Sequence, residues 1–211
     1  DDNAARERLL SSIEGTPITE PRPIRFMTGQ RKQYWHKNCI ALGLSSGFIE
    51  PLESTSIHFI QNGIMWLLLM FPDSVMSQAS VDEYNNKLRS EAERIRDFIV
   101  LHYYANQRIG EPFWDMCRDL PIPDSLSQRL ALFKDAGRVF KPQEDVFSEN
   151  SWVQVMMGQG IMPERYHNIV DSMSTEQLRQ FLDDIQNDVE RTVAALPNHG
   201  AFVEALVAQA K

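Results

Sequence analysis

The sequence is poor in cysteine, in positive charge and in long apolar runs, and each shortage excludes a class of protein. Its two cysteines, Cys39 and Cys117, have neither the spacing of metal ligands nor the pattern of a disulfide framework. Because no signal peptide opens the chain either, we expect a reducing, cytoplasmic location. The net charge of −8 argues against nucleic acid or an anionic membrane as partner, since both bind surfaces rich in lysine and arginine.

The apolar runs are too short for a membrane span. The longest, residues 64–71, falls well below the roughly 20 residues that a transmembrane helix needs, so we expect a buried core helix there. The five histidines show no metal-ligand spacing, so no metal is expected. A hydrophobic content of 43% in 211 residues is sufficient for a substantial core.

Local patterns predict a few strands followed by helices. Residues 1–15 read as a short helix, and strands are expected at 24–27 and 34–42, with a turn at 28–31 between them. A capping box of Ser80 and Glu83 predicts a long helix that ends near Tyr104. Later helices are expected to begin at a cap or a proline, at Pro112, Ser125, Ser148, Pro163, Ser174 and about Gly200.

The most unusual stretch is residues 36–71, in which small residues at 41–47 lead into a run with helical spacing. If this helix begins at 51–53, the amides of residues 54–57 lie in its first turn and have no partner four residues earlier. Such amides form an anion site for phosphate, carboxylate or halide. The alternative is a tight turn into an ordinary buried helix, and the spacing alone does not decide between the two.

The string Asn38–Ile57, NCIALGLSSGFIEPLESTSI, resembles the flavin-dependent halogenases of the tryptophan halogenase family. Residues 22–31 and 98–118 continue the resemblance, whereas the family's GxGxxG and WxWxIP motifs do not occur. The resemblance implies an α+β, mainly α fold, the C-terminal portion of a flavin monooxygenase-like enzyme. Residues 1–72 would complete a flavin-binding domain and carry the halide-site helix, and 73–211 would form a helical substrate-binding domain.

The chemistry implied by the resemblance is chlorination or bromination of an indole or another electron-rich aromatic compound through hypohalous acid. It would need reduced FAD, supplied by a separate flavin reductase, together with O2 and chloride or bromide. The family's essential lysine belongs to the N-terminal part that is missing here, since Lys32 and Lys37 do not match it. This chain alone is therefore expected to be inactive, and a homodimer of the complete enzyme stays open.

The resemblance also assigns roles to individual residues. Glu53 would stabilise the charged substrate ring or take its proton, and Ser54 would orient Glu53 or the active halogen species. The main-chain amides of Thr55 and Ser56 would hold the halide, and the flavin would meet Gly43, Leu44, Ser45 and Ile57. The alternative for Glu53 is an ordinary first-turn glutamate that complements the helix dipole.

Substrate binding is assigned by the resemblance to a segment rich in aromatic residues, with Tyr103, Tyr104, Glu111, Phe113 and Trp114 as candidates. Trp114 is the better ring contact, while Phe113 is slightly better explained as a core residue. Arg118 stands where enzymes acting on free tryptophan carry asparagine, so the expected substrate is not necessarily free tryptophan.

Two other functions remain open from the sequence. A flavin-dependent aromatic hydroxylase would share the fold but would not need the helix start at residues 53–56. A non-catalytic helical interaction module would use Gly43–Gly47 only as a packing turn.

Overall fold

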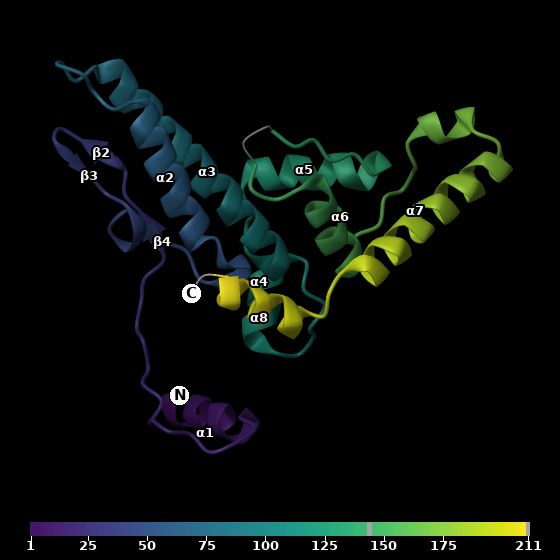
Figure 1. Ribbon diagram of the computed structural model, residues 1–211, viewed down its shortest axis with the longest axis horizontal. Coiled ribbons are helices and arrows are strands. Elements are labelled where there is room, and N and C mark those ends of the chain that lie inside the picture. Colours follow the sequence, from purple (N-terminus) through teal and green to yellow (C-terminus); the bar gives the residue numbers. More distant parts are fainter. Residues whose placement is uncertain (143–144, 210–211) are drawn as a thin grey trace.

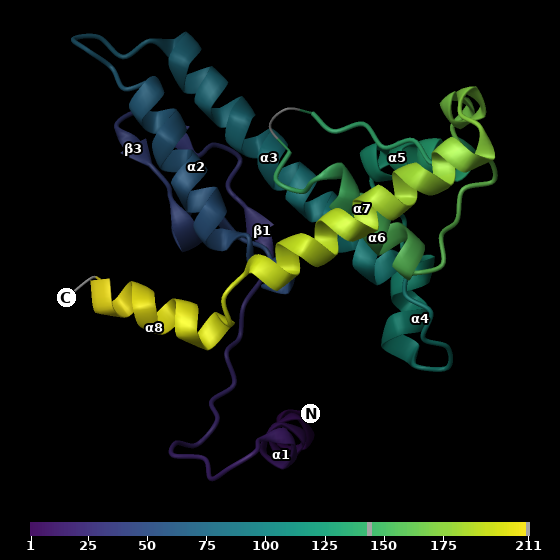
Figure 2. The same cartoon turned by 45° about the vertical axis from the view of Figure 1, so that its right-hand side comes forward.

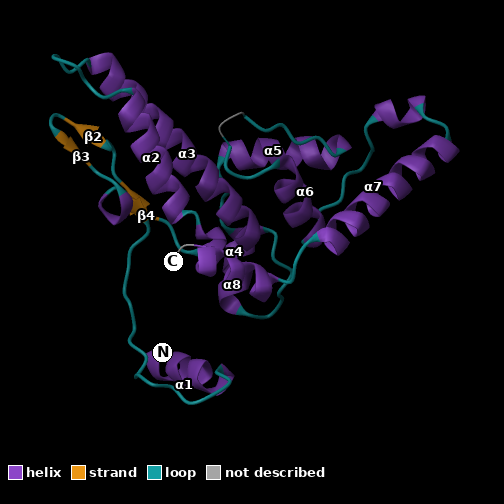
Figure 3. Cartoon of the chain, in the orientation of Figure 1, coloured by secondary structure: helices purple, strands orange, loops and turns teal. Residues whose placement is uncertain are grey.

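The computed structural model describes residues 1–142 and 145–209 and is mainly helical, which confirms the predicted fold class (Figures 1 and 3). The α-helices are α1 Asp2–Ser12, α2 Ser56–Leu69, α3 Gln78–Tyr104, α4 Pro112–Asp119, α5 Asp124–Ala136, α6 Glu149–Gly158, α7 Thr175–Ala195 and α8 His199–Gln209. Three short 3-10 helices are η1 Gly43–Ser45, η2 Leu52–Ser54 and η3 Asn168–Ser172. The strands form two antiparallel pairs, β1 Gly29–Gln30 with β4 Gly47–Phe48, and β2 Trp35–His36 with β3 Cys39–Ile40.

Helix α3 is central to the fold. Helix α2 packs along one half of it, and α5 and α6 pack against the other half (Figure 1). The buried residues of α3 recur at helical spacing, which explains why one helix serves two cores. The larger core joins its C-terminal half to α5 and α6 and contains Ile95, Phe98, Ile99, Leu101, Leu126, Leu130, Phe133, Phe147, Trp152 and Met156. The smaller joins its N-terminal half to the β2 region and contains Tyr34, Trp35, Val81, Tyr84 and Leu88.

Helix α2 packs on α3 through Gly63, where an added Cβ atom would lie 3.5 Å from the Tyr84 hydroxyl and 3.8 Å from Leu88 Cδ1, and only 2.7 Å from Leu42 Cδ2 of the preceding loop. Its opposite face is open, because Met65 and Leu68 are 60% and 70% exposed. The expectation of a fully buried helix at 64–71 is therefore wrong for this chain. An apolar helix face that is exposed in this way is normally buried against another protein segment.

The segment expected to form a single strand, 34–42, is instead a hairpin. Lys37 takes a left-handed conformation with φ of 51°, which turns β2 back on β3. The buried side chain of Asn85 fixes this hairpin to α3, because its Oδ1 accepts hydrogen bonds from the backbone amides of Tyr34 and Trp35 at 2.7 and 2.9 Å. No strand forms at 24–27, and β1 lies in the expected turn.

The predicted helix limits are partly correct. Pro112 opens α4, Ser148 caps α6, and Ser174 forms a capping box with Gln177 at the start of α7. The Ser80 capping box is wrong, since α3 already begins at Gln78, and α5 begins at Asp124 with Pro123 as its N-cap residue. Pro163 opens no helix, because the chain there is extended up to η3.

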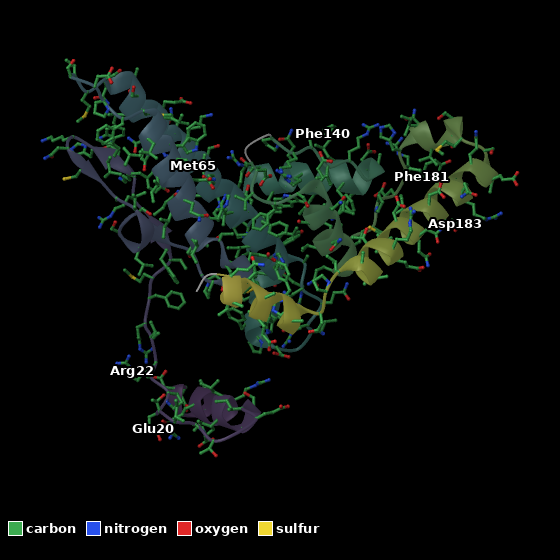
Figure 4. All side chains as sticks on the ribbon, viewed as in Figure 1. Glu20, Arg22, Met65, Phe140, Phe181 and Asp183 are labelled. Carbon is green, nitrogen blue, oxygen red and sulfur yellow. The ribbon has the colours of Figure 1, made fainter. Side chains whose placement is uncertain are left out.

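Helices α1, α7 and α8 contain no buried residue in the described part of the chain. In Figure 2, α7 and α8 form an angled arm, and α1 lies apart at the end of an extended segment. Phe181 of α7 and Met65 of α2, labelled in Figure 4, are 53% and 60% exposed. None of the described helices has the length and apolar character to cross a membrane.

A buried carboxyl group lies between α2 and α3. Glu91 is 2% exposed, and its Oε1 accepts the Asn62 amide at 2.7 Å and lies 3.1 Å from His58 Nε2. Burial is the largest effect on this group and raises its pKa, although the hydrogen bond from Asn62 and the nearby His58 oppose the change. The charged form of Glu91 therefore opposes folding.

Replacing Glu91 by glutamine is expected to raise the free energy of unfolding by about 1 kcal/mol at pH 7 and to leave it nearly unchanged at pH 4. Because the pKa is higher in the folded state, wild-type stability falls as pH rises from the ordinary value of 4.5 through the raised one. Glutamine removes this fall and can still pair with Asn62 and His58. Urea unfolding at both pH values measures the effect, and an equal gain at the two would contradict it.

Candidate functional site

A short turn between Pro51 and Ser56 sets the geometry of the candidate site. Residues 52–54 form one 3-10 turn, and α2 begins only at Ser56, so the expected helix start at 51–53 is wrong. Glu53 and Ser54 separate the two helices because both have positive φ angles, 69° and 51°. Such conformations cost about 1 to 3 kcal/mol each and persist where surrounding contacts hold them.

The first amides of α2 are unpaired. The Phe59 amide is the first to find a helical acceptor, the Thr55 carbonyl oxygen at 2.9 Å. Within residues 1–142 and 145–209, the amides of residues 56–58 have no acceptor, and Thr55, the N-cap residue, makes no side-chain cap hydrogen bond. The Ser54 amide is excluded from the predicted set, because it donates to Pro51 at 2.9 Å. Unpaired amides at a positive helix end are able to bind an anion.

Glu53 points from this turn toward the end of α3. Its Oε1 lies 3.1 Å from Nε2 of His102, and the two side chains are 33% and 19% exposed. The other ring nitrogen of His102, Nδ1, lies 2.8 Å from the Phe98 carbonyl oxygen. The acid is thus held against protein rather than directed into bulk solvent.

A second carboxylate of the same turn, Glu50, meets the next residue of α3. Tyr103 donates its hydroxyl to Glu50 Oε2 at 2.9 Å, while the other carboxylate oxygen is buried without a hydrogen-bond partner among the described residues. Burial, followed by the hydrogen bond to Glu50, raises the pKa of Tyr103 to about 12. The Tyr103 hydroxyl therefore keeps its proton near neutral pH and remains a donor.

Three predicted substrate residues form an aromatic cluster where α3 meets α4. Tyr103 stacks on Trp114 with ring centroids 5.7 Å apart, and Phe113 meets the Trp114 ring edge to face at 5.1 Å. Phe113 is 54% exposed, so the interpretation of Phe113 as a core residue is wrong. The guanidinium of Arg108 lies 5.2 Å from the Trp114 ring centroid and also 3.7 Å from Glu111.

Asn106 and Arg118 fix this cluster. The buried Asn106 amide donates to the carbonyl oxygens of Tyr103 and Trp114 at 2.6 and 3.1 Å. Its Oδ1 accepts from Arg118 at 2.8 Å, and Arg118 also pairs with Asp115. Arg118, which departs from the pattern of the free-tryptophan enzymes, is therefore used here to join α4 to the loop after α3.

The loop before β4 forms a cavity beside the start of α2. The cavity has a volume of about 120 Å³ and is lined by Gly43, Leu44, Thr55 and Ser56 among others. It is smaller than the roughly 300 to 1,000 Å³ of pockets that enclose a drug-sized ligand. The side chains of Leu44 and Ile57 are 79% and 71% exposed. Ser45 does not offer a free hydroxyl, because it donates to the Leu42 carbonyl oxygen at 2.7 Å.

The structure brings Tyr103, Phe113 and Trp114 together, and it places Glu53 against His102, the residue before Tyr103 in α3. It does not bring Glu111 or Tyr104 into this cluster. Glu111 is exposed, and Tyr104 packs against the larger core. Sequence reasoning missed the roles of His102, Glu50 and Asn106, because their partners lie far away in the chain or on the backbone. Only the position of His102 directly before Tyr103 could have drawn attention to it.

The whole chain has the architecture of known enzymes. A flavin-dependent halogenase from Xanthomonas campestris, Xcc4156, superimposes with a TM-score of 0.92 and 46% identity over 97% of this chain and 41% of its own. BrvH, a flavin-dependent halogenase from Brevundimonas sp. BAL3, gives 0.89 and 40% identity over 98% and 42% of the two chains. The fold is thus the mainly helical part of the flavin-dependent halogenase fold.

The sequence comparisons define the family. The family model described as Tryptophan halogenase matches residues 1–175. The 7-chloro-L-tryptophan 6-halogenase KtzR of Kutzneria sp. is 34% identical over 73% of this chain and 31% of its own length. The chain belongs to the tryptophan halogenase family, and it spans less than half the length of these relatives.

Proposed function

We propose that this chain supplies the halide site and the aromatic substrate site of an enzyme that halogenates an indole or another electron-rich aromatic compound. The observation that carries the proposal is the segment 50–56. The first amides of α2 have no acceptor among the described residues, Glu53 meets His102 of α3, and Glu50 meets Tyr103 of the aromatic cluster. A halide at these amides and a substrate ring at the cluster would therefore lie on two sides of this segment.

Each group of residues has a role that follows from its chemistry. The amides that open α2 hold chloride or bromide without a basic side chain, because the helix end supplies the positive charge. Glu53 lies where it can stabilise the cationic ring formed when a halogen adds, and then accept the ring proton. Ser54, beside it, orients the acid or the halogen species.

O2 would be the oxidant that converts the halide to hypohalous acid, with reduced FAD as the second electron donor. The exposed side chains of Leu44 and Ile57 would contact the flavin, with Gly43 and Ser45 of the same loop beside it. A separate flavin reductase provides the reduced cofactor. The substrate ring lies against Tyr103, Phe113 and Trp114, while Glu111 lies at the exposed edge and Tyr104 supports the cluster from the side of the larger core.

The remainder of the enzyme would contain the rest of the flavin site and the catalytic lysine. We propose that residues 1–72 complete this flavin-binding domain and that 73–211 form the substrate-binding domain. The exposed apolar faces of α2 and α7 support the presence of further protein, since faces of this size are normally buried. Cys39 and Cys117 are both free, which agrees with a reducing cytoplasm.

The product of the complete enzyme tests the proposal. Incubation with reduced FAD, O2, bromide and indole is expected to give bromoindole in an amount that depends on bromide. A hydroxylated product without bromination would reject halogenation in favour of an aromatic hydroxylase. If neither product forms and no flavin binds, the chain is a helical interaction module.

Removal of the Trp114 ring gives a separate prediction. Trp114→Leu is expected to raise KM for indole about tenfold with a smaller change in kcat, since a ring contact contributes about 0.5 to 1.5 kcal/mol beyond burial. The control is Asp119→Asn at the exposed end of the same helix. Steady-state bromination measures both constants, and an unchanged KM would place the substrate elsewhere.

A further inference from the structure

His102 carries contacts that the proposed function does not use. Its Nδ1 lies 2.8 Å from the Phe98 carbonyl oxygen, and its Nε2 lies 3.1 Å from Glu53 Oε1. Both partners are acceptors when Glu53 is ionised. The ring is therefore held between the backbone of α3 and the carboxylate of the turn before α2.

Other charged groups nearby have partners of their own in the described chain. Glu50 of the same turn accepts from Tyr103 of α3, and Arg118 of α4 pairs with Asp115. His58 of α2 pairs with Glu91 of α3, and α6 contributes only Glu149 at its exposed first position. Glu53 is therefore the charged partner of His102.

We propose that His102 is the positioning residue for the Glu53 carboxylate. This inference rests on the proposed function, because it names the group that orients the proposed catalytic acid. Glu53 sits in a left-handed backbone conformation, and the contact with His102 joins its side chain to the rigid end of α3. A displacement of about 1 Å at a reacting group costs about 100-fold in rate, so losing this contact has a large effect.

Two matched variants of the complete enzyme separate the two ring nitrogens. His102→Gln places an amide N–H near the position of Nε2, whereas His102→Asn places one near Nδ1 and leaves Glu53 without its partner. We expect kcat for indole bromination to fall about 100-fold in His102→Asn and less than tenfold in His102→Gln. Equal losses in the two variants would overturn the positioning role.

The coupling between flavin oxidation and bromination gives a readout that a merely structural role would not change. In His102→Asn, oxidation of reduced flavin is expected to stay near the wild-type rate while bromination falls, because the contact orients Glu53 and not the flavin. A parallel loss of both activities would contradict the positioning role.

The contact itself is measured without halogenation by 15N NMR of the histidine-labelled complete enzyme, with the signal assigned from His102→Gln. The Nε2 chemical shift of His102 is expected to differ between wild type and Glu53→Gln. An unchanged shift would refute the contact even if Glu53→Gln is inactive. Full bromination by Glu53→Gln would instead reject the proposed role of Glu53, while the NMR result still decides whether the contact exists.

Discussion

Glu53→Gln is expected to lower the rate of halogenation by about 100-fold or more while reduced flavin is still oxidised. A positioned general base contributes about 10² to 10⁴ in rate, and glutamine has neither the negative charge nor the basicity of the carboxylate. The oxidation of the cofactor does not need Glu53 in this account, so hypohalous acid would form and escape unused. Bromoindole formation and flavin oxidation, followed in the same reaction, measure the loss of coupling.

The control for Glu53→Gln is the same substitution three residues earlier. Glu50→Gln keeps an oxygen that accepts from Tyr103 and removes one negative charge from the same turn. Its loss is expected to be less than tenfold. Undiminished halogenation by Glu53→Gln, or equal losses in the two variants, would remove Glu53 from the mechanism.

Ser56→Asp is expected to raise the halide concentration needed for half-maximal rate by about tenfold or more. An aspartate at the first position of α2 places a negative charge beside the unpaired amides and can itself accept from them. Because acidic residues stabilise helix N-termini, the variant should fold. The rate of bromination as a function of bromide concentration gives the constant.

Ser56→Asn is the matched control, since it has nearly the same shape without the charge. We expect its halide requirement to change only a few-fold. If Asp and Asn at this position give the same bromide dependence, the halide does not bind at the start of α2.

Local sequence signals were sufficient where one residue type controls a helix end. Pro112 takes the first position of α4 as predicted, and Gly137 ends α5 in the left-handed conformation that glycine commonly takes after a helix. Ser174 begins α7 as predicted, and the side chains of Ser174 and Gln177 accept from each other's backbone amides. These features depend on contacts within four residues, so the sequence alone contains them.

Features that depend on tertiary contacts could not be read in this way. The start of α2 moves to Ser56 because Glu53 and Ser54 take left-handed conformations, which neither propensity nor spacing predicts. The capping pattern at Ser80 fails because α3 continues through it to pack on Trp35 and Tyr34.

In the candidate site, the resemblance named Glu53, Tyr103 and Trp114, and the structure adds how they are held. The contact between Glu53 and His102 joins two elements distant in sequence, so no short motif contains it. The exposure of the apolar side of α2 could not be predicted either, because a sequence pattern shows that a helix face is apolar but not what covers it.

The most direct test of the halide site is a crystal structure of the complete enzyme grown in bromide, with anomalous scattering used to locate the ion. We predict a bromide peak within hydrogen-bond reach of the first amides of α2, with the Glu53 carboxylate still against His102. The central claim would be contradicted if those amides donated to other protein atoms instead and no bromide lay at the start of α2.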